Sequence, residues 1–595
     1  MSLQFILGTA SYDHEKVIMD SLRNAIDTKS EDEFFYIVPN HIKFESEVQA
    51  LKNLNVNDDD IYAESKFQTF SITRLVWYYM KNHPEYQKTH LSESGINMLI
   101  YQILLDHQDE LTVFRGETDQ PGFIQKIGQQ IGEMQAGQIS ADDLKRIVDN
   151  NDKINAGLRD KMHDFIIIYR GFEEATQGKY LYKSDVLNLF CRYIETNELD
   201  LSHSHFYFNG FNQFTAQEAK LVELLIKQAQ SVTIGLNLDH KYPDELPQGP
   251  SLFFQSAKWY HRFYNIARVN NVPVLVDQFA KQQRVSDDLL SLDQFWAQST
   301  ALGTIDDHQL KDNTSLQIYK ADNPFAEVEL IASKIRRMVA QQGYHYSDFL
   351  ILTRHLDRYQ NVLNPIFSQM EIPAFNDVSK SMADHPLVEL INALFSLEDG
   401  GRKYQYQDVM RLLKTELMLP KIDDENYLSI EDYRKYVALT ENLVLKNGYE
   451  GSRWTQKDDW QYAWLSDDDF GITAQRFRDI SEKINVIRHF IRDNFPPFFK
   501  SIKAAKTGQE AAGILYQFLI SMGVSDQLVN WRNQAIHDED LVKAGQSEQV
   551  WQTFCNLLDD YVSMLGHHEF VAADFLDLLQ SGFSGASYSQ IPSTL

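Results

Sequence analysis

The chain has 595 residues, of which 43% are hydrophobic and 24% charged, enough apolar material for several packed cores. Its formal net charge of -28 excludes a protein that coats nucleic acid non-specifically, because such binding depends on clustered Lys and Arg side chains. Two distant cysteines, Cys191 and Cys555, exclude a disulfide framework, and no apolar run approaches the length of a membrane span. We therefore expect a large globular protein of the cytoplasm without a membrane partner.

Residues 3–26 predict a strand, a tight loop and a helix. An apolar run of strand length leads to a turn at Gly8, after which apolar residues recur at helical spacing. This is the frame of the phosphate-binding loop G-x-x-x-x-G-K-[ST], whose Lys and hydroxyl hold phosphates and magnesium. Counted from Gly8, the second Gly, the Lys and the hydroxyl residue are replaced by Asp13, His14 and Glu15. Two carboxylates repel a triphosphate, so these residues alone leave open a degenerate nucleotide loop or a simple strand-to-helix connection.

Further strands alternate with helices in two parts of the chain. Residues 91–199 predict helices only, whereas buried-strand runs are predicted at residues 34–38, 66–70, 205–208 and 231–239. This pattern indicates one α/β domain, made of residues 1–90 and 200–310, with a helical insertion at 91–199.

The predicted helix after residues 66–70 carries a nucleic-acid signal. Ser71 caps it, and Arg74 and Trp77 lie three residues apart, hence on one face. A planar cation beside an indole can bind a phosphate and stack on a base of a single strand. The alternative is that Trp77 packs inward and Arg74 is a solvated rim residue.

A second α/β unit is predicted to follow. Residues 311–398 contain strand patterns at 314–319 and 348–354 around an amphipathic helix, and residues 399–595 predict helices almost exclusively. We expect this second α/β domain to be incomplete in the chain, with residues 399–595 as its helical insertion.

Four ordered segments resemble the AddB/RexB family, the B subunit of bacterial ATP-dependent helicase/deoxyribonucleases. They are residues 5–22 with FFYIVPN, then FQTFSITRLVW, then FYFNGFNQFTAQE with VTIGLNLD, then the stretch from AEVELIASKIRRM to MADHPLVELI. The resemblance covers the whole chain and implies two superfamily 1-type, RecA-like parallel-sheet domains, each with a large helical insertion. The altered loop is similar to that of the RexB branch, whose members lack the intact loop of AddB proteins.

The resemblance also implies a role in recombinational repair of double-strand DNA breaks. In the family the A subunit (AddA/RexA) supplies ATP-driven translocation, and the nuclease domain of the B subunit, a 5'-3' exonuclease, cuts one strand. The helicase-like lobes hold the other strand and scan it for the Chi sequence. We expect the nuclease, with its magnesium and the iron-sulfur cluster of many members, to lie beyond residue 595. This chain is then expected to have no catalytic centre, metal or cofactor of its own.

The resemblance places six residues at positions that contact the Chi strand. Arg74 and Trp77 match the family in type, and Phe211, after the Asn209-Gly210 turn, is expected to stack on a base. The other three positions carry different side chains, which predicts that a different sequence is read; they are His41, Lys43 and Ile72.

Three functions are compatible with these observations. The favoured one is a non-hydrolysing, helicase-like scaffold that guides single-stranded DNA from double-stranded ends and reads Chi. The second is an active superfamily 1-type ATPase with an atypical nucleotide site. The third is a structural scaffold for the A subunit that never contacts DNA, which the charge of -28 favours.

Overall fold

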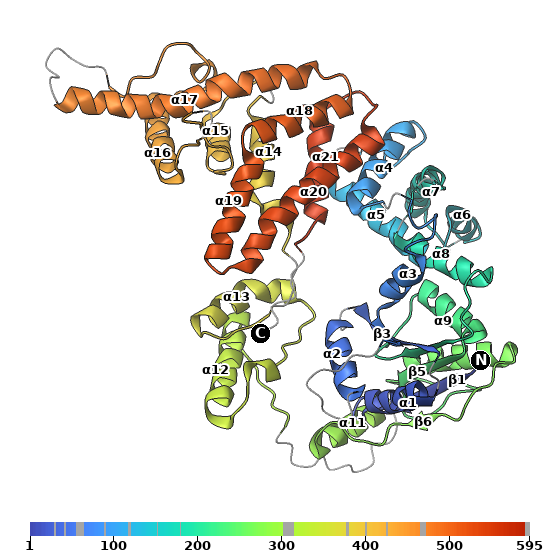
Figure 1. The fold of residues 1–595 in the computed structure, drawn as a ribbon. Coiled ribbons are helices and arrows are strands. Elements are labelled where there is room, and N and C mark those ends of the chain that lie inside the picture. The colour runs from blue at the N-terminus through green and yellow to red at the C-terminus, as the bar shows by residue number, and fades with distance from the viewer. Residues whose placement is uncertain are drawn as a thin grey trace. The chain divides into compact units, whose positions relative to one another are not determined.

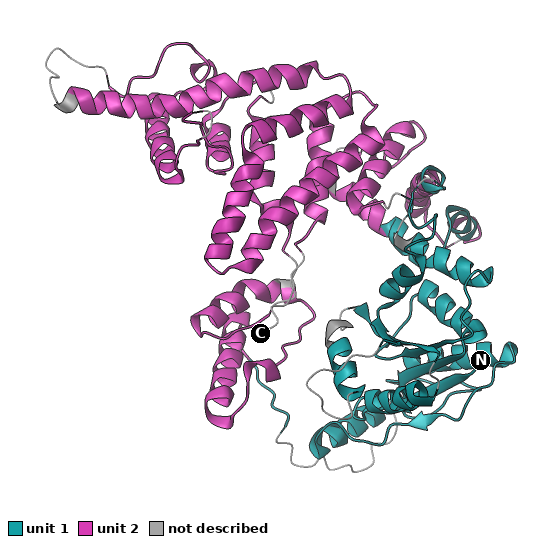
Figure 2. Ribbon diagram, viewed as in Figure 1, with its two compact units in different colours: residues 1–90, 130–147, 173–320 teal, residues 91–129, 148–172, 321–595 magenta. Residues whose placement is uncertain are grey.

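The computed structural model describes most of the chain (Figure 1). The described residues are 1–595 except 29–30, 41–42, 55–64, 89–90, 117–120, 152, 179, 182, 301–314, 376–379, 399–400, 424–425, 464–471 and 589–595. They divide into two compact units (Figure 2). Unit 1 contains Met1–His90, Gln130–Ile147 and Glu173–Lys320, and unit 2 contains Leu91–Gln129, Val148–Phe172 and Ala321–Leu595.

Unit 1 contains a parallel sheet of six strands in the order β3-β2-β4-β5-β1-β6. All strands predicted in the first α/β domain are confirmed, and a short edge strand, β6, adds to them. The apolar side chains of the five predicted strands are buried almost continuously, as in parallel sheets covered on both faces. The strands are β1 (Leu3–Gly8), β2 (Glu33–Ile37), β3 (Phe67–Phe70), β4 (Ser204–Phe208), β5 (Ser231–Asn237) and β6 (Gln278–Phe279).

Helices cover both faces of this sheet (Figure 1). Because successive strand residues point to opposite faces, Phe34 and Tyr36 of β2 join one core and Phe35 and Ile37 the other. The first core is closed by α1 (His14–Thr28) and α2 (Lys43–Leu54). The second is closed by α3 (Ile72–Met80), α8 (Lys183–Glu195), α9 (Ala216–Gln228) and α10 (Phe254–Val269).

Unit 2 is helical and joins parts of the chain that are far apart in sequence. Helix α4 (Glu93–Asp106) is apolar on nearly all sides and packs against α20 (Leu541–Leu565) and α21 (Ala572–Gly585). The Ser94 hydroxyl donates to the Asp560 carboxylate at 2.8 Å, and the Asn97 amide donates to Ser581 at 3.3 Å. The C-terminal part of the chain is therefore tied to a helix of the predicted first insertion, whose residues are shared between the two units.

Most of the other helices confirm the helical pattern of residues 91–199 and of the region after 399, and two lie outside these regions, at Asp287–Thr300 and Pro386–Ser396. They are α5 (Pro121–Ala136), α6 (Ala141–Asp149), α7 (Ala156–Thr176), α11 (Asp287–Thr300), α14 (Pro386–Ser396), α15 (Tyr406–Leu413), α16 (Ile430–Asn447), α17 (Ile472–Ala504), α18 (Gly508–Ser521) and α19 (Val524–His537). Within the described ranges, no helix is both long enough and apolar enough to cross a bilayer. The α/β fold class with large helical insertions is confirmed.

The second α/β unit differs from its prediction in one respect. Helices α12 (Pro324–Gln342) and α13 (Leu356–Gln369) form the expected core. The described parts of the predicted strands 314–319 and 348–354 are irregular, because neither pairs with another described strand. Ile351 packs on the helical core, whereas its neighbours Leu350 and Leu352 are 80% and 83% exposed.

Candidate nucleic-acid interface

Both sequence-predicted sites follow the carboxyl ends of strands in unit 1. The loop into α1 leaves β1, α3 leaves β3, and the turn before Phe211 leaves β4. Since all strands are parallel, these ends lie at one edge of the sheet, where open α/β sheets bind their ligands. The edge therefore contains both the candidate nucleotide site and the candidate DNA site.

Helix α3 has one face in the core and one face in solvent. The Ser71 hydroxyl caps it by accepting the Arg74 N–H at 3.3 Å, which fixes where the helix starts. Apolar residues anchor the inner face, and the outer face carries three side chains at helical spacing. The inner residues are Ile72, Leu75, Val76 and Met80, and the outer ones are Arg74, Trp77 and Lys81.

The outer residues form a ladder of cation, indole and cation, here called the α3 ladder (Arg74, Trp77 and Lys81). The Arg74 guanidinium carbon lies 4.2 Å from the centroid of the Trp77 ring, and the Lys81 ammonium lies 5.1 Å from it. Both distances fall within the roughly 6 Å range of cation–π attraction. Trp77 is 37% exposed, so its ring is not a core residue. The inward-packing alternative for Trp77 is therefore wrong.

Lys81 was not among the predicted site residues. It occupies the C-cap of α3, where its N–H donates to the Trp77 carbonyl at 3.0 Å. Its position four residues after Trp77 is the sequence signal that could have identified it.

Of the remaining predicted DNA contacts, Ile72 and Phe211 do not belong to the exposed face of α3. Ile72 is only 6% exposed, because it belongs to the core that anchors α3. Phe211 is half-buried and stacks on Phe214 with ring centroids 4.9 Å apart. Lys43 begins α2, but its side chain lies outside the described atoms, and His41 lies outside the described residues. The structure thus brings together Arg74 and Trp77 but leaves the other four positions as predictions.

The side chain of His14 occupies the space inside the loop after β1. The His14 Nε2–H donates to the Gly8 carbonyl at 2.9 Å, and the ring lies so close that a Cβ on Gly8 would be 3.0 Å from Nε2. Burial lowers the pKa of His14, so the imidazole is neutral at physiological pH. A neutral ring directed at Gly8 stands where an intact loop has a cationic Lys.

A second segment covers the same loop from outside. The Asp13 N–H donates to the Gln282 carbonyl at 2.9 Å, and the Arg284 N–H donates to the Ser11 carbonyl at 3.0 Å. The Arg284 side chain also donates, through Nε, to the Ala10 carbonyl at 2.7 Å. These bonds use loop carbonyls and a loop N–H, leaving fewer groups for a ligand.

The neighbouring strand ends are also neutral or acidic. Asn209, at the end of β4, donates its amide to the Tyr36 hydroxyl at 2.8 Å. Burial raises the pKa of Tyr36, and the nearby Glu15 carboxylate adds to this effect. These groups provide neither the Lys of a phosphate site nor the acid of a magnesium site at β4.

A cluster at the opposite, amino edge of the sheet is structural. Asp32 accepts hydrogen bonds from His203 Nδ1 and His205 Nε2, each at 2.9 Å. The Ser231 hydroxyl lies 2.6 Å from His205 Nδ1, so both nitrogens of that buried ring are engaged. Within the described part of the chain, no group of three or more His, Cys, Asp or Glu side chains is arranged to hold a metal.

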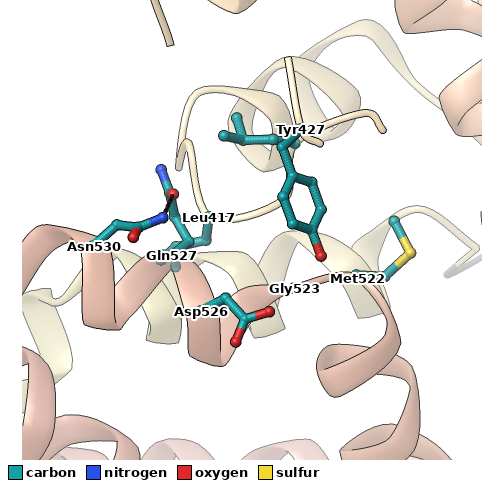
Figure 3. A pocket seen from close by; sticks show the side chains of 8 residues that line it. Leu417, Tyr427, Met522, Gly523, Asp526, Gln527 and Asn530 are labelled. Atoms are coloured by element: carbon teal, nitrogen blue, oxygen red, sulfur yellow. Dashed lines mark hydrogen bonds between the residues drawn. The ribbon is translucent and has the colours of Figure 1, made fainter. Parts of the chain in front are cut away.

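Unit 2 contains a pocket that is too small to be a ligand site. Figure 3 shows Tyr427 directed at the turn before α19, where a Cβ on Gly523 would overlap the Tyr427 hydroxyl. The cavity measures about 10 Å³, room for about one water molecule. It is lined by Leu417, Leu419, Tyr427, Met522, Gly523, Asp526, Gln527 and Asn530.

Comparison with known proteins identifies the first half of the chain. Residues 5–293, which contain the sheet, the loop and the α3 ladder, match the family model described as ADDB, N-terminal. The chain belongs to the AddB/RexB family. Three of the four ordered segments lie within these residues, and the resemblance noted in them is confirmed.

Curated relatives extend the similarity to the whole chain. A protein of Levilactobacillus brevis, named as the B subunit of an ATP-dependent helicase/deoxyribonuclease, is 48% identical over 599 residues. Proteins with the same name from Lactiplantibacillus plantarum and Latilactobacillus sakei are 45% and 42% identical. Each alignment covers 100% of this chain and 50% of the relative, so the chain spans about half the length of these AddB/RexB proteins.

Proposed function

We propose that this AddB/RexB chain is part of the B subunit of a heterodimeric helicase–nuclease that processes double-strand DNA ends for recombinational repair. Within it, these residues form a helicase-like scaffold that binds a single DNA strand and does not hydrolyse ATP. The names of the relatives support the subunit role, and the α3 ladder is the observation that carries DNA binding.

The chemistry of the ladder suits a single strand. An exposed indole offers a flat surface for one unpaired base, and stacking of this kind contributes about 1–3 kcal/mol per base. Arg74 and Lys81, on either side of Trp77 along the helix, are placed to contact the phosphates that flank that base. A chain of charge -28 needs such a local cationic surface, because its overall field repels DNA.

The loop after β1 supports the absence of ATP turnover. Its Lys position holds a neutral His14 bonded to Gly8, and Asp13 and Glu15 add negative charge where phosphates would lie. We infer that the A subunit supplies the ATP-driven movement and that this surface guides the strand. Selective reading of a Chi sequence by the same surface is part of this proposal.

A binding assay tests the proposal. The intact chain is titrated against labelled single-stranded oligonucleotides of varied sequence, with and without the A subunit, and fluorescence anisotropy gives the affinity. Trp77→Ala is expected to weaken binding by about 1–3 kcal/mol. Trp296→Ala is the matched control, since Trp296 is also an exposed Trp of unit 1, 59% accessible on α11. Equal affinities of the wild-type chain and Trp77→Ala would contradict the proposal.

One observation favours the alternative of a structural scaffold that does not contact DNA. The charge of -28 fits a scaffold that contacts only the A subunit. That function predicts that the chain alone binds no oligonucleotide, and that Trp77→Ala leaves the affinity of its complex with the A subunit unchanged. An ATPase assay addresses the active-motor alternative, for which turnover abolished by His14→Ala would be the positive result.

A further inference from the structure

Unit 2 contains a cluster of exposed cations where two distant segments of the chain meet. Arg402 and Lys403 lie in the loop between α14 and α15, and Lys500 and Lys503 lie one helical turn apart near the C-terminus of α17. All four side chains belong to exposed residues. They are here called the α17 patch (Arg402, Lys403, Lys500 and Lys503).

Two contacts hold these segments together. The Glu398 carboxylate accepts a hydrogen bond from the Lys403 ammonium at 3.2 Å, and it also accepts one from the Lys503 ammonium. Beneath the surface, the buried rings of Tyr404 and Phe499 pack with their centroids 6.3 Å apart. Since Tyr404 directly follows Lys403 and Phe499 belongs to α17, this contact fixes the loop against the helix.

The patch has more positive charge than the end of the helix explains. The C-terminus of a helix carries partial negative charge, which accounts for lysines in the last turns of α17. It does not account for Arg402 and Lys403, which come from another segment. Among the described residues, Glu398 is the only acidic residue that forms an ion pair with a member of the patch. Four cations therefore face one carboxylate, in a chain whose formal net charge is -28.

The chemistry of the patch differs from that of the α3 ladder. The aromatic rings beneath it are almost completely buried, with exposures of 3% for Tyr404 and 4% for both Phe498 and Phe499. These rings offer no surface on which an unpaired base could stack. Exposed cations without a stacking ring contact phosphates and not base edges, and a duplex presents its phosphates while its bases stay paired.

We propose that the α17 patch binds the phosphate backbone of double-stranded DNA without sequence preference. This goes beyond the proposed function, which places a single strand on the α3 ladder of unit 1. It rests on that function only for the choice of DNA among polyanions.

The salt dependence of duplex binding tests this site. A labelled blunt-ended duplex is titrated with the intact chain at several salt concentrations, and fluorescence anisotropy gives the affinity. Arg402→Ala/Lys500→Ala removes the two members of the patch that are not bonded to Glu398. We expect about tenfold weaker binding and a slope of log K against log salt reduced by about 1.8, because each phosphate contact contributes about 0.9. Both residues are exposed, so the variant should melt with the wild type.

Two further variants are the controls. Arg476→Ala/Lys543→Ala removes two exposed cations elsewhere in unit 2 and should bind the duplex like the wild type. Trp77→Ala, in unit 1, should also keep the wild-type affinity for the duplex. If Trp77→Ala leaves single-strand binding unchanged, the proposed function fails, and the duplex titration still decides the role of the α17 patch.

Three results would overturn the proposal. The first is an unchanged salt slope in Arg402→Ala/Lys500→Ala, and the second is an equal loss of affinity in Arg476→Ala/Lys543→Ala. The third is a wild-type chain that binds vesicles of anionic phospholipid but not the duplex, which would assign the patch to a lipid surface.

Discussion

The N-termini of α1 and α3 lie at the same edge of one sheet but differ in how accessible they are. The loop into α1 is closed, with His14 bonded to Gly8 inside it and Asp293 bonded to its hydroxyls. The start of α3 is open, with Trp77 exposed between two cations. The comparison teaches that a shared scaffold does not impose a shared chemistry, because each site resides on its own loop or helix face.

The largest expected effect concerns what holds the open site in place. Leu75 is fully buried under α3, so Leu75→Ala is expected to lower the free energy of unfolding by about 2–5 kcal/mol. Urea denaturation measures this loss. Thr73→Ala, on the exposed side of the same helix, should leave it within about 0.5 kcal/mol. If Leu75→Ala lowers the free energy of unfolding only slightly, the buried face of α3 is not what holds the α3 ladder in place.

The cations of the open site should be visible in the salt dependence of binding. Removing Arg74 is expected to weaken single-strand binding by about 1.5 kcal/mol and to reduce the slope of log K against log salt by about 0.7. Anisotropy at several salt concentrations gives both values. Arg268→Ala is the control, since Arg268 is exposed on α10 with one long ion pair, 3.8 Å from Asp244. An unchanged slope for Arg74→Ala would mean that Arg74 does not contact a phosphate.

The closed site should affect stability and not DNA binding. His14→Ala removes the donor to the Gly8 carbonyl and is expected to cost about 1 kcal/mol of unfolding free energy. The affinity for single strands should stay at the wild-type value, as it should for Lys16→Ala on the exposed side of α1. Loss of DNA binding in His14→Ala would show that the loop into α1 also contributes to DNA binding, which would contradict the difference drawn here between the two sites.

The smallest effect is expected at the amino edge, away from both sites. Asp32 has a lowered pKa because it accepts from His205 and His203, and the pKa of His203 is raised by the same carboxylate. The contribution of Asp32 is lost as pH falls through its lowered pKa, and that of His203 is lost as pH rises through its raised pKa.

Unfolding of Asp32→Asn at two pH values checks this assignment. The stability difference from the wild type should be larger near pH 5 than near pH 8.5, because only at the lower pH are both groups charged. Asp20→Asn, next to Arg23 on α1, should show no such change. If the stability difference between Asp32→Asn and the wild type is the same at both pH values, the ion pair of Asp32 with His203 does not contribute to stability.

The parts of this architecture with local signals could be predicted from sequence. Strands such as residues 34–37 are continuous apolar runs, and the capped start of α3 follows from Ser71 and the spacing of the residues after it. The stacking of Arg74 on Trp77 follows from their separation of three residues. In each case the interaction that decides the structure lies within a few residues.

Other features depend on partners far away along the chain. The contact of Asp293 with Thr9 and Ser11 has no local signature, and neither does the burial of Ile72, which the shape of the surrounding core determines. The apolar segment at residues 349–353 has strand character, but a strand also requires a hydrogen-bonded neighbour, and the described residues provide none. Pairing is a property of the fold and not of the segment.

The packing of α4 on α20 and α21 has a consequence for how the protein is made. Ser94 and Asp560 are 466 residues apart, and ribosomes add about 5–20 residues per second, so α4 leaves the ribosome about 20–90 s before its partner exists. Throughout that interval a helix that is apolar on nearly all sides lacks the surface that covers it in the finished structure. During synthesis of this protein, the apolar surface of α4 is therefore available to chaperones for tens of seconds.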